Sequence, residues 1–147
     1  MPLSDLPTLA DLQRTVRVTQ KSAMQTRLDR ATALQAASEA NWREVCAQVN
    51  QRDGFCCRCC GRRTNPRGLT LLERGHHHHI VYRSALGEDS TANICLICAE
   101  CHDEEHVKRT LSIEGNADVA LTFSRKDPAG QWYVSRQESS PGVTEKD

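Results

Sequence analysis

The first fifty residues carry the pattern of a helix. Residues 8–53 contain neither Gly nor Pro, and Ala, Gln, Arg and Leu dominate them, which predicts helix. The apolar positions of this segment form only a rough stripe, so we expect it to pack loosely or to project. A second helix is expected to begin near Asn41, because Asn41 and Glu44 have the spacing of a capping box. Its apolar face, which we expect to be core, consists of Trp42, Val45, Cys46 and Val49.

Shorter elements are expected in the rest of the chain. The helix should end near Arg52, because Asp53 and Gly54 signal a turn. A Cys- and Arg-rich loop follows, and the last ten residues, rich in Ser, Gly and charge, predict a disordered tail. The elements predicted between them are strands at 69–72 and 79–82, a helix from 98 to about 109, and a β-hairpin formed by 120–123 and 131–134.

The composition limits how such a chain can fold. Only 38% of the residues are hydrophobic and 4% are aromatic, which argues against a large self-sufficient core. The sequence has no apolar run long enough for a membrane span and does not begin with a signal-peptide pattern. We therefore expect a cytoplasmic protein without a membrane partner. In that compartment the eight cysteines indicate metal binding or reactivity rather than disulfides.

Charge is distributed unevenly although it sums to zero. The 19 Lys and Arg residues balance the 19 Asp and Glu residues. Residues 52–83 nevertheless hold seven arginines against two acids, and residues 84–106 hold six acids with no Lys or Arg. An arginine-rich block suits contacts with phosphate. An ordinary solvated loop would have the same composition, so charge alone leaves both interpretations open.

Seven of the cysteines form two clusters with C-x-x-C spacing. Two such pairs, far apart in the chain, are what a tetrahedral zinc site with four thiolates requires; redox chemistry is the alternative. Each cluster offers two registers, 56/59 or 57/60 and 95/98 or 98/101. We prefer 57/60 because Gly61 follows, and 98/101 because Cys95 lies in an apolar run. Cys46 is expected to be a core thiol. The predicted zinc ligands are Cys57, Cys60, Cys98 and Cys101.

All six histidines lie between positions 76 and 106. Four are consecutive, His76 to His79, and their internal position before an apolar strand argues against an affinity tag. His102 and His106 are four residues apart on a predicted helix, so they project from one face and can hold one metal ion. Asp103, Glu104 and Glu105, between them, are expected to form a solvated helix face.

Taken in order, these residues resemble the HNH nucleases of bacteria and their phages. The resemblance covers residues 42–110 and rests on Trp42, Arg52-Asp53-Gly54, Cys57-x-x-Cys60-Gly61, His78-His79-Ile80, Arg83-Ser84, Gly87, Asn93-Ile94-Cys95-Leu96-Ile97-Cys98 and Cys101-His102-x-x-x-His106. It implies an α+β fold class with a small ββα-metal core, in which two strands and a helix hold one divalent ion beside the four-cysteine zinc site.

The resemblance also implies roles for single residues. In the family the general base is followed by an Ile, so Ile80 sets the register within the histidine run and His79 would be the base. Asn93 would shape the loop and orient His79. The ligands of the catalytic ion would be His78, His102 and His106. A neutral histidine can accept the proton of a water molecule near physiological pH, and a metal with open positions can activate a phosphodiester. The ion itself would be Mg²⁺, Mn²⁺, Ni²⁺ or Zn²⁺.

The resulting hypothesis is a metal-dependent endonuclease that hydrolyses DNA. The main alternative is a zinc-stabilised nucleic-acid-binding module without cleavage, and a zinc-ribbon interaction domain is a third reading. The arginines expected to contact the DNA backbone are Arg58, Arg62, Arg63, Arg67, Arg74 and Arg83. The expected organisation is an N-terminal helical extension (1–40) that could serve a homo-oligomer or protein partner, a nuclease domain (41–110), a β-hairpin (111–137) and the tail (138–147).

Overall fold

The computed structural model describes residues 7–139 and divides the chain into two units, Met1–Ala40 and Asn41–Asp147. The predicted tail, apart from its first two residues, lies outside the described residues. None of the helices within 7–139 combines the length and the apolar character that a membrane span needs.

Helix α1 spans Leu9–Arg52. It begins with a reciprocal cap, because the Asp11 amide donates to Thr8 Oγ1 at 3.2 Å and the Thr8 amide donates to Asp11 Oδ2 at 3.0 Å. The prediction that a second helix begins at Asn41 is wrong: α1 continues through that position, since no Gly or Pro interrupts it. It ends where Gly54 and Phe55 adopt left-handed φ angles of 60° and 57°. In the first unit the apolar side chains of α1 are exposed.

A two-stranded antiparallel sheet lies at the centre of the second unit. Strand β1 is His76–His79 and strand β2 is Ile94–Ile97, with His76 opposite Ile97 and His79 opposite Ile94. All four residues of β2 are buried. Cys95 and Ile97 belong to one core cluster, whereas Ile94 and Leu96 pack with Val45 and Val49 in another. This explains why β2 is apolar on both faces.

Short helices flank this sheet. Helix α2 (Leu71–Arg74) precedes β1, and two 3₁₀ turns (Arg83–Ala85 and Thr91–Asn93) lie between the strands. Helix α3 (Ala99–Asp103) follows β2 and continues as the π-helical turn η4 (Glu104–Lys108). The strand predicted at 69–72 is wrong, because Thr70 and Glu73 form a capping box that starts a helix. The strand predicted at 79–82 lies three residues earlier.

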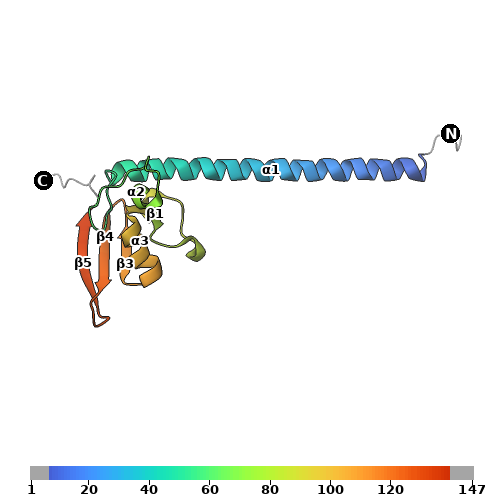
Figure 1. Ribbon diagram of the computed structural model, residues 1–147. Helices are drawn as coiled ribbons and strands as arrows, with labels where there is room; N and C mark the ends of the chain where they lie inside the picture. The colour runs from blue at the N-terminus through green and yellow to red at the C-terminus, as the bar shows by residue number, and fades with distance from the viewer. Residues whose placement is uncertain (1–6, 140–147) are drawn as a thin grey trace. The chain divides into compact units, whose positions relative to one another are not determined.

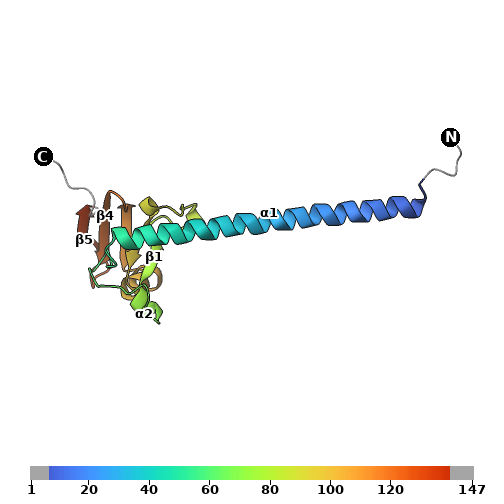
Figure 2. The ribbon, with the colours of Figure 1, turned by 90° about the horizontal axis from the view of Figure 1, so that it is seen from above.

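A second antiparallel sheet completes the unit. It consists of β3 (Leu111–Asn116), β4 (Ala120–Lys126) and β5 (Trp132–Ser139) in the order β3-β4-β5. Figure 1 and Figure 2 show β4 and β5 side by side. The predicted hairpin is therefore present as β4 and β5, but a third strand, β3, extends it. Leu111 and Ile113 of β3 are buried against Leu121 and Phe123, and Ser112 between them is half-buried, so β3 turns alternate residues toward the core.

A buried ionic network joins the end of α1 to the rest of the unit. Asp53 is 6% exposed and accepts four hydrogen bonds, from Arg52 Nε at 2.7 Å, Arg52 Nη2 at 3.0 Å, Arg58 Nη1 at 2.9 Å and the Leu96 amide at 2.8 Å. Arg58 is 4% exposed and also donates to Glu138. Arg58 was expected to contact DNA. Its burial and its internal partners make it a structural residue instead.

Replacing Asp53 with Ala is expected to destabilise the second unit by about 3–5 kcal/mol, because two buried or half-buried arginines lose their shared carboxylate. Urea unfolding followed by circular dichroism measures the change. Asp118→Ala is the matched control, since Asp118 also pairs with Arg52 but its side chain is 41% exposed; it should cost about 1 kcal/mol or less. Equal losses in the two variants would show that the Asp53 network does not support the fold in this way.

Candidate metal centres

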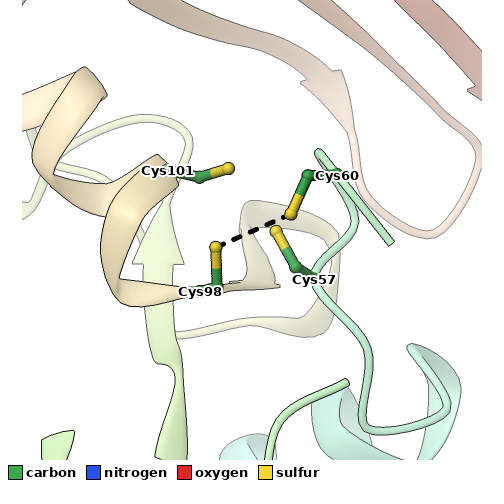
Figure 3. A group of neighbouring side chains, drawn as sticks. All are labelled: Cys57, Cys60, Cys98 and Cys101. Atoms are coloured by element: carbon green, nitrogen blue, oxygen red, sulfur yellow. Dashed lines mark hydrogen bonds between the residues drawn. The ribbon is translucent and has the colours of Figure 1, made fainter. Parts of the chain in front are cut away.

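Four cysteine thiols converge between the loop after α1 and the start of α3. Cys57 and Cys60 lie in a tight loop in which the Gly61 amide donates to the Cys57 carbonyl at 2.8 Å and Gly61 has a φ of 78°. Cys98 caps α3 and Cys101 lies within it. Figure 3 shows the four sulfurs gathered in one place, and all four lie within 4.8 Å of one another.

The spacing of these sulfurs suits zinc. Cys60 Sγ and Cys98 Sγ are 3.7 Å apart. In a tetrahedral site with Zn–S bonds of about 2.3 Å, neighbouring sulfurs lie about 3.8 Å apart. The hydrogen bond with Cys101 lowers the pKa of Cys57 to about 5, although burial opposes that shift. The same hydrogen bond raises the pKa of Cys101, so Cys57 ionises before Cys101, and the thiolate is the form that binds metal.

The remaining cysteines of the two clusters lie outside this group. Cys95 is fully buried in β2, where burial raises the pKa of its thiol. Cys56 pairs with Arg63 in an isolated β-bridge. Cys59 is buried next to the group and accepts a hydrogen bond from Arg125 Nη2 at 3.3 Å. The four thiols that converge are therefore those of the 57/60 and 98/101 registers, which the sequence favoured.

Strand alternation gives the four consecutive histidines two different environments. His76 and His78 face α3 and η4, where the His76 ring stacks on His102 with centroids 4.2 Å apart. His77 and His79 face the end of α1. His77 Nε2 lies 2.9 Å from Asn50 Oδ1, and the His79 ring stacks on Trp42 with centroids 5.5 Å apart and planes 9° from parallel. Identical side chains in one run therefore have distinct environments because side chains alternate along a strand.

A second candidate metal group consists of His78, Glu105 and His106. His78 Nδ1 lies 4.0 Å from Glu105 Oε2, and His106 Nδ1 lies 3.1 Å from the same oxygen. His78 Nδ1 and Glu105 Oε2 are both buried without a hydrogen-bond partner. Burial, reinforced by the neighbouring histidines, lowers the pKa of His78 to about 3. A neutral imidazole and a carboxylate facing each other without partners fit a divalent ion.

His102, the third histidine expected at the catalytic ion, lies at the edge of this group. Its ring centroid is 4.4 Å from that of His106 but 6.4 Å from that of His78.

The prediction that Asp103, Glu104 and Glu105 form a solvated helix face needs correction. Glu105 is 7% exposed, Glu104 pairs with Arg125, and only Asp103, paired with Lys108 at 2.9 Å, lies at the surface. The π-helical turn η4 is the reason, because its wider turn places residues differently from the α-helix that the spacing assumed.

The loop after β1 is closed by Asn93. Its side chain accepts from the Val81 amide at 2.8 Å and donates to the carbonyls of Val81 and Glu88, each at 3.0 Å. His79 Nε2 lies 2.7 Å from Asp89 Oδ1. Burial by itself would raise the pKa of Asp89, but hydrogen bonds with Arg83 and His79 hold that pKa below its ordinary value. Sequence reasoning missed Asp89, because its contact with His79 depends on how the loop folds back.

These two centres lie within the segment that matches a known family. Residues 57–108 match the family model described as HNH endonuclease. This match confirms the resemblance seen in the sequence. No curated protein and no solved structure matches the chain significantly. The matched segment contains the four converging cysteines, the histidines of β1, and Asn93, Glu105 and His106, whereas all of α1 and the sheet β3-β4-β5 lie outside it.

A cleft lies over the histidines of the matched segment. A cavity of about 530 Å³ is lined by His78, His79, His106, Tyr82 and Arg83 among others.

The other arginines that were expected to contact DNA have varied surroundings. Arg62 pairs with Glu100 at 2.7 Å, Arg74 donates to the Gly68 carbonyl, and Arg83 holds Asp89 through two bonds of 2.9 Å. Arg63 and Arg67 are exposed and line a separate cavity of about 820 Å³.

Proposed function

We propose that this protein is a metal-dependent HNH endonuclease that hydrolyses phosphodiester bonds of DNA. The observation that carries the proposal is the pair of buried atoms without partners, His78 Nδ1 and Glu105 Oε2, beside His106. They lie in a segment that matches the HNH endonuclease model, next to a cleft that His79 also lines. An ion there, held by His78 and His106 with His102 nearby, would polarise a phosphodiester and stabilise the departing oxygen.

His79 is the general base of the proposed reaction. Because Asp89 Oδ1 lies 2.7 Å from His79 Nε2, Nε2 carries the ring hydrogen and Nδ1 is the basic nitrogen. That nitrogen takes the proton of the attacking water. Asn93 holds the backbone of the loop that begins directly after His79, and Trp42 fixes the plane of the His79 ring by stacking. Both therefore keep the base in one orientation.

Structural zinc at Cys57, Cys60, Cys98 and Cys101 is the second part of the proposal. It would connect the loop after α1 to the start of α3, the helix that leads to His102 and His106. The chain has a small apolar core in which cysteines are prominent, so metal binding would supply much of its folding energy.

Substituting Ala for Arg62, Arg63 and Arg67 together is expected to weaken binding to all duplexes alike. Each lost phosphate contact should reduce the slope of log K against log salt concentration by roughly one unit. Fluorescence anisotropy with duplexes of unrelated sequence, at several salt concentrations, measures this. Arg136→Ala on β5, outside the matched segment, is the control and should leave the slope unchanged. Loss confined to one sequence would instead indicate base readout.

The alternative, a nucleic-acid-binding module without cleavage, would use the same cysteines and arginines. It would have no use for a buried carboxylate facing two histidines beside His79. Nicking of a supercoiled plasmid by the purified protein on addition of Mg²⁺, Mn²⁺, Ni²⁺ or Zn²⁺, and its absence in EDTA, would support the nuclease. Plasmid that is bound but stays intact with every ion would support the module.

A further inference from the structure

Glu105 is a buried carboxylate that pairs with no Lys or Arg of residues 7–139. Its described ion-pair contacts are with His78 and His106 alone. A buried carboxylate is costly unless it is paired or binds a metal ion. The oxygen without a hydrogen-bond partner, Oε2, is the one that faces both histidines.

Tyr82 fixes which oxygen of Glu105 faces the histidines. Its hydroxyl donates to Glu105 Oε1, which leaves Oε2 directed at His78 and His106. The Tyr82 ring also packs against both imidazoles, with centroids 5.4 Å from that of His106 and 6.0 Å from that of His78. One side chain thus contacts all three members of the group.

The π-helical turn η4 places Glu105 and its neighbour His106 at the same ion. Adjacent residues of an α-helix point about 100° apart, so a motif reading that assumes an α-helix assigns only His102 and His106 to one face. In η4, Glu105 and His106 each place a ligand atom within 4.8 Å of one another and of a ring nitrogen of His78. Such turns recur at functional sites.

We propose that Glu105 is a direct carboxylate ligand of the catalytic ion, with His78 and His106, and that Tyr82 is the positioning residue that holds it. This inference rests on the proposed function but departs from the three-histidine set that the family resemblance implies. A carboxylate oxygen among the ligands favours Mg²⁺ and Mn²⁺ more than an all-imidazole site does. His102 then lies beside the ion, stacked on His76.

Binding of Mn²⁺ to the zinc-loaded full chain, followed by electron paramagnetic resonance of the free ion, tests this without relying on activity. Glu105→Gln keeps the shape of the side chain and is expected to weaken Mn²⁺ binding by at least about 10-fold, because mutation of a residue that only supports a ligand already costs about that much. Asp103→Asn, an exposed acid on the same helix, is the control and should bind as wild type does. Circular dichroism and zinc content establish that each variant is folded.

A double-mutant cycle tests the part played by Tyr82. Tyr82→Phe should weaken Mn²⁺ binding several-fold by itself, yet add no further loss when Glu105 is already Gln, because it acts through that carboxylate. Additive losses would overturn the positioning role. Wild-type affinity in Glu105→Gln would overturn the ligand assignment alone, whereas a wild-type protein that binds no Mn²⁺ would overturn the catalytic-ion site itself.

Discussion

Replacing Cys101 with Ser is expected to abolish zinc binding and to unfold the second unit. The apparent binding energy of a structural zinc site is about 10–16 kcal/mol, which is comparable to or larger than the total stability of an ordinary domain, about 5–15 kcal/mol. The chain has little else to replace it, because the core cluster next to the site is itself built partly of cysteines. Cys57→Ser should have the same effect.

Elemental analysis and thermal unfolding measure the outcome. Cys56→Ser provides the matched control, because Cys56 is adjacent to Cys57 but lies outside the four-thiol group; it should retain one zinc per chain and a melting temperature close to that of wild type. A Cys101→Ser protein that melts like wild type, or a wild-type protein without zinc, would refute the structural site.

Local chemical rules were sufficient to predict part of this fold. The choice of Cys57 with Cys60 depended on a glycine at the next position, and Gly61 indeed adopts a left-handed φ of 78°. The exclusion of Cys95 depended on its apolar neighbours, and the whole of β2 is buried. Both arguments concern a few adjacent residues whose backbone requirements do not depend on the rest of the chain.

Contacts between distant segments could not be predicted in the same way. In the sequence Arg58 is indistinguishable from the other arginines of the basic block. In the structure it donates to Asp53, Glu138 and the Ala117 carbonyl. Glu105 was expected on a solvated helix face because the prediction assumed α-helical geometry, whereas residues 104–108 form a π-helical turn. Asp89 reaches His79 only through a loop that Asn93 closes. In each case the deciding partner comes from another element or from a turn that composition does not specify.

A His79→Ala variant is expected to lower DNA cleavage by roughly 10²–10⁴-fold, the usual contribution of a general base. His79 belongs to neither candidate metal group, so zinc content, Mn²⁺ binding and DNA affinity should stay close to wild type. Single-turnover cleavage at saturating protein measures the chemical step. His76→Ala is the control on the same strand and should have a small effect. Cleavage by His79→Ala at the wild-type rate, with equal bound metal, would mean that another group is the base.

The most direct test of the nuclease assignment follows ion occupancy and cleavage in the same samples. Mn²⁺ is titrated into zinc-loaded protein mixed with supercoiled plasmid, and bound Mn²⁺ and nicked plasmid are quantified together. Nicking should rise with the occupancy of one Mn²⁺ site per chain and should be lost when His78 is replaced by Ala. Plasmid that stays bound and intact at full Mn²⁺ occupancy would show that the protein is not a nuclease.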